Sequence, residues 1–207
     1  MSAQPPSVLT IGHSTHSIEA FVELLRQHGV TALVDVRSAP FSRFNPQFNR
    51  ATLERDLKAQ GIKYVFLGRE LGARSDDPGC YDGGRVQYAR LARTAGFQAG
   101  LGRVVEGAKL YRVALMCAEK EPLECHRTLL VARALVARDV AVEHILADGS
   151  LESQDRALTR LLKLVGLPEQ DLFLDRQQLV DEAMARQEAQ IAFVDERLAA
   201  ESQGDSQ

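Results

Sequence analysis

The stretch Ala32-Leu33-Val34-Asp35-Val36-Arg37 decides the fold, because it is apolar and rich in β-branched residues apart from Asp35 and the final arginine. Such a run is typical of a central strand buried on both faces of a parallel sheet. Similar apolar runs predict further strands at 8–11, 62–67, 111–116 and 140–146. Helical patterns lie between these strands, at 17–28, from about 50 to 61, at 86–105 and at 126–138.

Strands that alternate with helices predict an α/β fold, with three layers built around a mostly parallel, roughly five-stranded, Rossmann-like sheet. We expect a core domain over residues 1–147. Residues 148–207, with two helical patterns broken near Gly166, indicate a C-terminal helical extension packed on or beside that core. The polar, glycine-rich stretch 68–84 is long for a loop in a compact domain, which favours a functional or mobile segment.

Composition excludes several classes of protein. Of the 207 residues 45% are hydrophobic, which is enough for a core, yet no apolar run approaches the about 18 residues that a membrane span needs. The first six residues lack a basic start and an apolar stretch, so we expect a cytoplasmic protein with no membrane partner. Three cysteines without an export signal argue against a disulfide framework.

The net charge of −3 hides an asymmetry along the chain. Residues 36–112 hold 14 Lys and Arg against 7 Asp and Glu, whereas residues 148–207 hold 6 against 13. A basic central segment indicates an anionic partner. The alternative is that these arginines only keep the surface soluble. The oligomeric state is left open by the sequence.

Ligands of a parallel sheet bind beyond the carboxyl ends of its strands, so residues that follow strands are the candidates for a site. After the first strand, Gly12-His13-Ser14-Thr15 offers a close backbone approach, a catalytic His13, and hydroxyls of Ser14 and Thr15 for an anion. After the second, Asp35 and Arg37 point to the same side. Asp35 is the first candidate for a catalytic carboxylate and Arg37 for a phosphate ligand; a structural salt bridge is the alternative.

The loop 40–50 interleaves phenylalanines with arginines and amides. Arg43 is a candidate phosphate ligand, and Phe44 and Phe48 are candidates for stacking on a base. Packing of these rings on the core is the alternative.

The fourth strand leads to Cys117 and Glu119, and the next helix starts at Cys125-His126-Arg127. Glu119 is the second candidate carboxylate. Arg127, placed in a first helical turn where the helix dipole disfavours a cation, is a candidate anion ligand. Cys117, Cys125 and His126 are candidates for thiol chemistry. Zinc ligands usually pair across about two to four residues, and the seven between the two cysteines do not match, so we expect no metal and no cofactor.

Taken together, these motifs resemble the family called domain of unknown function 488. The resemblance runs from about Val8 to Ala147 and rests on Thr10-Ile11-Gly12-His13-Ser14, Asp35-Val36-Arg37 with Pro40 and Ser42-Arg43, Gly61-Ile62-Lys63-Tyr64, Leu67-Gly68, Leu71-Gly72, Met116-Cys117-Ala118-Glu119, Pro122 and Cys125-His126-Arg127. Ala73 departs from the second glycine that usually follows Leu71-Gly72 in the family, which affects the expected shape of that loop. The resemblance implies a link to excision of modified bases, such as 5-hydroxymethyluracil, from DNA.

The leading hypothesis is therefore a hydrolase of DNA-glycosylase type, acting in DNA repair, in which a carboxylate assists removal of a modified base. A thiol-dependent enzyme that uses Cys125 or Cys117 with His126 is the first alternative. A non-catalytic module that binds a nucleotide or an anionic metabolite at the same strand ends is the second.

Overall fold

The computed structural model describes residues 6–204. Residues 1–5, which carry most of the argument against a signal sequence, and residues 205–207 lie outside this range. Within it, the strands are β1 (Ser7–Gly12), β2 (Ala32–Asp35), β3 (Lys63–Phe66), β4 (Tyr81–Asp82), β5 (Arg85–Val86), β6 (Val113–Cys117), β7 (Ala141–Ile145) and β8 (Leu151–Ser153). The α-helices are α1 (Ile18–Gln27), α2 (Arg50–Ala59), α3 (Gly68–Leu71), α4 (Tyr88–Leu91), α5 (Ala95–Ala108), α6 (Arg133–Val136), α7 (Gln154–Leu164), α8 (Arg176–Ile191) and α9 (Glu196–Gly204).

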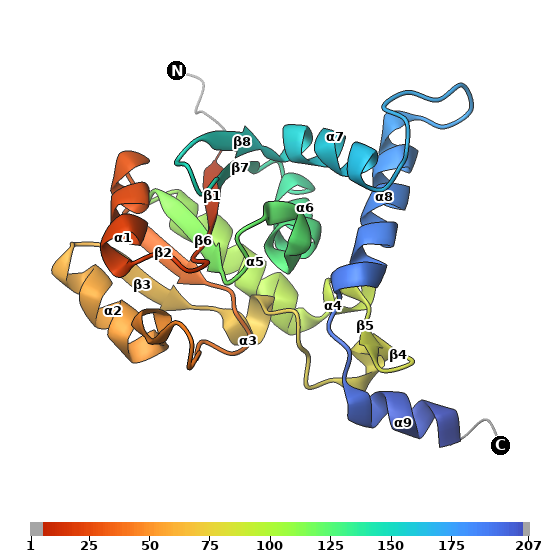
Figure 1. The fold of residues 1–207 in the computed structure, drawn as a ribbon, viewed down its shortest axis with the longest axis horizontal. Helices are drawn as coiled ribbons and strands as arrows, with labels where there is room; N and C mark the ends of the chain where they lie inside the picture. Colours follow the sequence, from red (N-terminus) through yellow and green to blue (C-terminus); the bar gives the residue numbers. More distant parts are fainter. Residues whose placement is uncertain (1–5, 205–207) are drawn as a thin grey trace.

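Six of these strands form one sheet in the order β3-β2-β6-β1-β7-β8 (Figure 1). All neighbours in this sheet run parallel except β7 and β8. The expected α/β fold with a mostly parallel central sheet is confirmed. The sequence missed β8, a three-residue edge strand with partly buried side chains, because it is too short and too polar to give an apolar signal.

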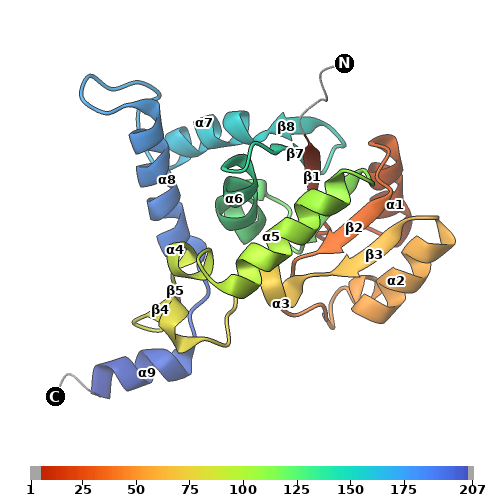
Figure 2. The ribbon, with the colours of Figure 1, turned by 180° about the vertical axis from the view of Figure 1, so that it is seen from behind.

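Helices cover both faces of the sheet. Leu33 of β2 packs with Phe21 of α1 and Leu57 of α2 in one apolar cluster. Val34, on the opposite side of β2, belongs to the second cluster with Leu101 of α5. Figure 2 shows α5 lying across the face of the sheet opposite α1 and α2. The two clusters follow from strand alternation, since successive residues of β2 point to opposite faces.

The connection after β1 leads to α1 on one face, whereas the connection after the adjacent strand β6 leads to the other face. The same reversal separates β6 from its other neighbour, β2. Chain segments that leave adjacent strands in opposite directions open a crevice at the carboxyl edge of a sheet. The topology therefore brings the residues after β1, β2 and β6 to one place.

Several expected elements differ from those observed. The helix expected at 86–105 is two helices, α4 and α5, because Thr94 ends the first stretch and caps α5 by accepting from the Phe97 N–H. The helix expected at 126–138 begins with a π-helical segment, Arg127–Ala132, before α6. The loop 68–84 contains α3, a 3₁₀ turn at Pro78–Cys80 and β4.

The C-terminal part of the described chain shares strands and apolar contacts with the core. The boundary expected at residue 147 falls within the β7–β8 hairpin. Buried residues of α8, such as Leu179 and Met184, belong to the same apolar cluster as the sheet. Three helices rather than two follow residue 150, and α9 lies beside the β4–β5 hairpin, where the Asp195 N–H donates to the Gly84 carbonyl (Figure 1).

Candidate active site

Backbone hydrogen bonds tie the three strand ends together. The N–H groups of His13 and Ser14 donate to the carbonyls of Cys117 and Ala118, each at 2.9 Å. Gly12 permits this approach, because a Cβ at this position would lie 1.8 Å from the Glu119 carbonyl oxygen. The glycine expected to allow a close backbone approach therefore contacts the Cys117–Arg127 segment of the protein itself.

A cavity of about 270 Å³ opens at these strand ends. Its walls include Arg37 and Ser38 after β2, Cys117 and Glu119 after β6, and Phe193 after α8. Its polar lining also includes Arg74, Tyr88, Glu124, Cys125 and His126. The cavity thus joins two of the three predicted strand-end motifs to residues from the distant C-terminal part of the chain.

Asp35 is fully buried and all its hydrogen bonds are internal. Arg37 donates from Nε to Oδ1 at 2.9 Å and from Nη2 to Oδ2 at 2.7 Å, and its backbone N–H also donates to Oδ1 at 3.1 Å. The Tyr64 hydroxyl of β3 donates to Oδ2 at 2.7 Å. Burial alone would lower the pKa of Arg37, but the hydrogen bonds and charge of Asp35 raise it above its usual value. This arrangement corresponds to the structural salt bridge that the sequence left open.

His13 extends the same network away from the cavity. Arg37 Nη1 donates to its Nε2 at 3.1 Å, which leaves Nδ1–H to donate to the Ser14 carbonyl at 2.8 Å. Burial lowers the pKa of His13 to about 4, so the ring is neutral at pH 7. The ring also stacks on Phe48, with centroids 4.3 Å apart. Both ring nitrogens are occupied, and Phe48 is fully buried, so neither residue faces a ligand in this conformation.

Arg127 is also an internal residue. Its guanidinium is fully buried and donates from Nη1 to the Glu119 carbonyl at 2.6 Å and from Nη2 to the Lys120 carbonyl at 3.2 Å. Its Nε has no hydrogen-bond partner within the described residues. Arg127 therefore holds the loop after β6 from beneath, and in this conformation it does not reach an external anion.

The remaining anion and stacking candidates lie at the surface. Thr15 and Arg43 are exposed, and Ser14 is half-buried with a positive φ of 47°. Phe44 is 87% exposed, and Phe41 in the same loop is 69% exposed. Ser38 and Ala39, at the start of this loop, line the cavity. The exposed rings and arginine of the loop 40–50 thus follow directly in sequence after two residues of the cavity lining.

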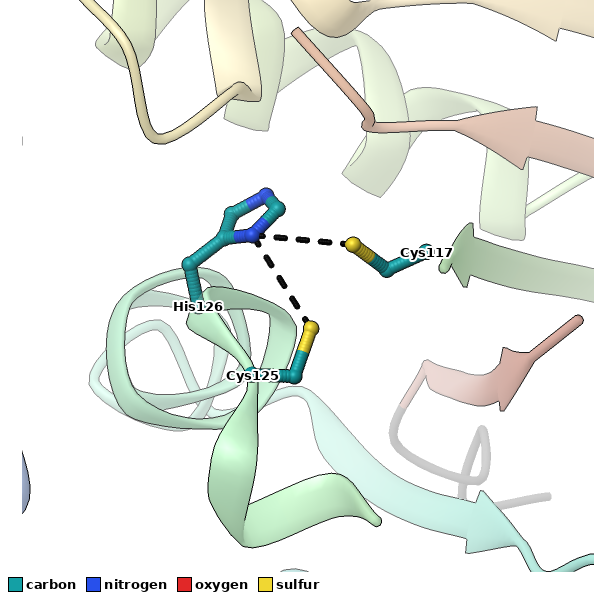
Figure 3. Close-up of side chains that lie close together, drawn as sticks. All are labelled: Cys117, Cys125 and His126. Carbon is teal, nitrogen blue, oxygen red and sulfur yellow. Dashed lines mark hydrogen bonds between the residues drawn. The ribbon is translucent and has the colours of Figure 1, made fainter. Parts of the chain in front are cut away.

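Cys117, Cys125 and His126 converge at the base of the cavity, from the end of β6 and the start of the π-helical segment (Figure 3). The His126 Nδ1 lies 3.6 Å from the Cys117 Sγ and 3.9 Å from the Cys125 Sγ. Glu119 Oε2 lies 2.9 Å from the first sulfur and 3.0 Å from the second. The two cysteines lie at one point although they are eight positions apart, because the turn between β6 and the π-helical segment folds the chain back.

The groups of this cluster perturb one another. Burial raises the pKa of the Cys117 thiol and, together with the charge of Cys125, that of the Glu119 carboxyl. Burial would also raise the pKa of Cys125, but the hydrogen bond from Cys117 and the charge of Arg127 lower it well below its usual value. Burial would lower the pKa of His126, but its interaction with Cys125 raises it. Two thiols, a carboxyl and an imidazole are thus gathered around one point and are coupled electrostatically to one another and to Arg127.

Sequence reasoning missed several cavity residues, namely Arg74, Tyr88, Glu124, Ile191 and Phe193. Arg74 and Phe193 meet across the chain, with the guanidinium carbon 4.3 Å from the ring centroid. They come from segments that do not follow a strand of the central sheet, so the strand-end rule gave no signal for them.

The fold and the site define a class of α/β protein with a polar cavity at the reversal point of a mostly parallel sheet. The sequence model of the family described as "Domain of unknown function DUF488" matches residues 17–134, more than half of the chain. The chain belongs to this family, as the resemblance indicated. The matched range contains β2, β6 and the Cys117–Arg127 segment but begins after His13. No curated protein and no solved structure matches the chain. Among the described residues, no helix has the length and apolar character to span a bilayer.

Proposed function

We propose that the protein is a hydrolase of DNA-glycosylase type that removes a base from nucleic acid, with the cavity as active site and Glu119 as the carboxylate. One observation carries this choice. Glu119 is an exposed residue that lines the cavity and accepts from the two cysteine thiols through Oε2, whereas Asp35 is fully buried and both its oxygens are occupied by Arg37 and Tyr64. The role first expected for Asp35 therefore passes to Glu119.

The chemistry suits a carboxylate in that position. In base excision, water adds to the sugar carbon, the bond to the base nitrogen breaks, and the base leaves with a proton. The sugar develops positive charge in the transition state, which a nearby carboxylate stabilises. The Glu119 carboxylate is partly withdrawn from water, where such an interaction is stronger than in bulk solvent.

Nucleic acid as the substrate is supported by the loop 40–50, which follows Ser38 and Ala39 of the cavity lining. Exposed aromatic rings contribute to binding of unpaired bases by stacking, and arginines contact phosphates. Phe41 and Phe44 are exposed on either side of Arg43, and Arg74 lines the cavity. We assign the stacking role to Phe44, because Phe48 is buried against His13.

A thiol-dependent reaction is the second candidate, favoured by the lowered pKa of the Cys125 thiol beside His126. The exposed fractions of Cys117 and Cys125 are only 3% and 1%, which weighs against attack by either sulfur on a bulky substrate. A non-catalytic binding module would use the same cavity without turnover.

The test is incubation of the protein with DNA duplexes that carry a panel of modified bases, followed by alkaline cleavage of any abasic site. The proposal predicts strand cleavage for at least one base, in unmodified protein and in protein treated with iodoacetamide. If the untreated protein releases base and the alkylated protein does not, the thiol-dependent enzyme is favoured. Binding without release across the whole panel would favour the non-catalytic module.

A further inference from the structure

We propose that Cys117, Cys125 and His126 bind a single zinc ion at the base of the cavity, with Glu119 available as the fourth ligand. The atoms that would bind the ion, two Sγ and Nδ1, all lie within 4.8 Å of one another, and the three residues are buried. The inference shares Glu119 with the proposed function, but its test is separate, because zinc binding is measured on the resting protein without substrate.

The separations between donor atoms fit a tetrahedral ion. Zinc bonds of about 2.3 Å to sulfur and about 2.0 Å to nitrogen, at a tetrahedral angle, place the two atoms roughly 3.6 Å apart. The observed distances from His126 Nδ1 to the two sulfurs are 3.6 and 3.9 Å. Glu119 Oε2 lies closer to the sulfurs, at 2.9 and 3.0 Å, so it would move outward by about 0.5 Å to reach the roughly 3.5 Å expected between zinc-bound sulfur and oxygen.

A backbone hydrogen bond holds the His126 ring so that its other nitrogen can bind a metal ion. Its Nε2 lies 3.1 Å from the Val36 carbonyl oxygen, a hydrogen bond that places the proton on Nε2. The Nδ1 lone pair of the neutral ring then points at the two sulfurs (Figure 3). Histidine ligands of zinc typically donate their other ring N–H to a carbonyl or carboxylate in this way.

The charges of the surroundings also suit a divalent cation. Two thiolates and one carboxylate would place three negative charges at one buried point, which is costly without compensation. Zinc supplies two positive charges, and the buried Arg127 guanidinium, held near the cluster by its hydrogen bond to the Glu119 backbone carbonyl, supplies the third. The Arg127 backbone N–H also lies 3.4 Å from the Cys125 Sγ, where it can stabilise a thiolate.

The local fold explains why this ligand set has an unusual spacing. Cys117 is the last residue of β6, and Cys125 and His126 immediately precede the π-helical segment Arg127–Ala132. π-Helical segments are rare and frequently mark functional sites. One side of the cluster faces the cavity, so an ion held by three protein ligands could exchange its fourth for water, as catalytic zinc sites do.

The experiment is metal analysis of the whole protein, stripped with a chelator and then dialysed against a small excess of zinc chloride. We expect one zinc per chain in the wild type. Removing a residue that hydrogen-bonds to a metal ligand typically weakens metal affinity roughly 10- to 100-fold. Cys117→Ala and Cys125→Ala each remove a ligand itself, so we expect them to weaken zinc binding by more than this. Cys80→Ala is the matched control, because Cys80 is equally buried but lies outside the cluster, and it should keep one zinc.

Cobalt(II) keeps the proposal testable if the cysteine variants fail to fold. The wild type loaded with cobalt should show the intense thiolate-to-metal absorption of a sulfur-bound ion and the visible bands of tetrahedral geometry. Folded wild type that retains less than about a tenth of an equivalent of zinc, or whose cobalt spectrum lacks the thiolate band, would overturn the proposal. Equal zinc content in Cys117→Ala and Cys80→Ala would do so as well. If zinc binds but no modified base is released, the proposed function alone fails.

Discussion

Asp35→Asn removes one negative charge from a fully buried pair and leaves the Arg37 guanidinium, which is 5% exposed, without its counter-ion. The asparagine amide keeps one acceptor oxygen, but its NH₂ group faces a donor, either Arg37 or the Tyr64 hydroxyl. Breaking a buried ion pair from one side typically costs about 3–5 kcal/mol. A domain of this size has a free energy of unfolding of about 5–15 kcal/mol, so the variant should remain folded at 25 °C but with a much lower urea midpoint.

The assay combines urea unfolding at pH 7 with base-release rates corrected for the folded fraction. Tyr64→Phe should cost less, about 1–3 kcal/mol, because it removes a single hydrogen bond to the same carboxylate. Glu106→Gln is the control: it breaks the exposed pair with Lys109, and should cost less than about 1 kcal/mol. An Asp35→Asn protein with wild-type stability and a rate reduced by about 10²-fold or more would refute the structural role and restore Asp35 as the catalytic carboxylate.

Three further predictions concern stability and binding. His144 is buried, and burial lowers its pKa from 6.5 to about 4, so the unfolded chain takes up the proton first as pH falls. The contribution of His144 to stability should be full above about pH 6.5 and should fall by up to about 3 kcal/mol towards pH 4, so urea titrations of His144→Gln should show a shallower loss. Gly12→Ala should destabilise the protein by about 1–3 kcal/mol or more in thermal melts, because the added Cβ would lie 1.8 Å from a backbone oxygen. Gly102→Ala is the control and should not destabilise it, because Gly102 of α5 has open space around it. Phe44→Ala should weaken DNA binding about 5- to 100-fold in anisotropy titrations, and the affinities should fall with salt. Phe173 is equally exposed, and Phe173→Ala should not weaken binding. Identical affinities of the two variants would show that the loop 40–50 does not contact DNA.

The sequence was sufficient to predict the five parallel strands of the central sheet and the edge of that sheet at which the cavity lies. Apolar runs such as 32–36 mark buried strands directly, and the rule for parallel sheets then places the residues after β1, β2 and β6 together. What local patterns could not predict is which polar atoms satisfy one another. Tyr64, which lies 29 residues after Asp35, occupies one of its oxygens, and this pairing depends on the register of β3 against β2.

The same limitation explains the other differences within the site. A phenylalanine in a polar loop can be free or buried, and the structure separates Phe44 from Phe48 in this respect. The two cysteines of the cluster are eight positions apart, and only the turn after β6 brings their side chains to one point. The far wall of the cavity, with Phe193, comes from the end of the chain, where no strand-end signal exists.

The most direct test of the proposed active site is the single-turnover rate of base release by Glu119→Gln, measured beside Glu124→Gln. Both changes remove one negative charge from an exposed glutamate that lines the same cavity, so general electrostatics should affect the two proteins alike. The account predicts a loss of about 10²-fold or more for Glu119→Gln and less than about tenfold for Glu124→Gln, with DNA affinity and thermal stability close to wild type in both. A folded, DNA-binding Glu119→Gln protein that releases base at the wild-type rate would contradict it.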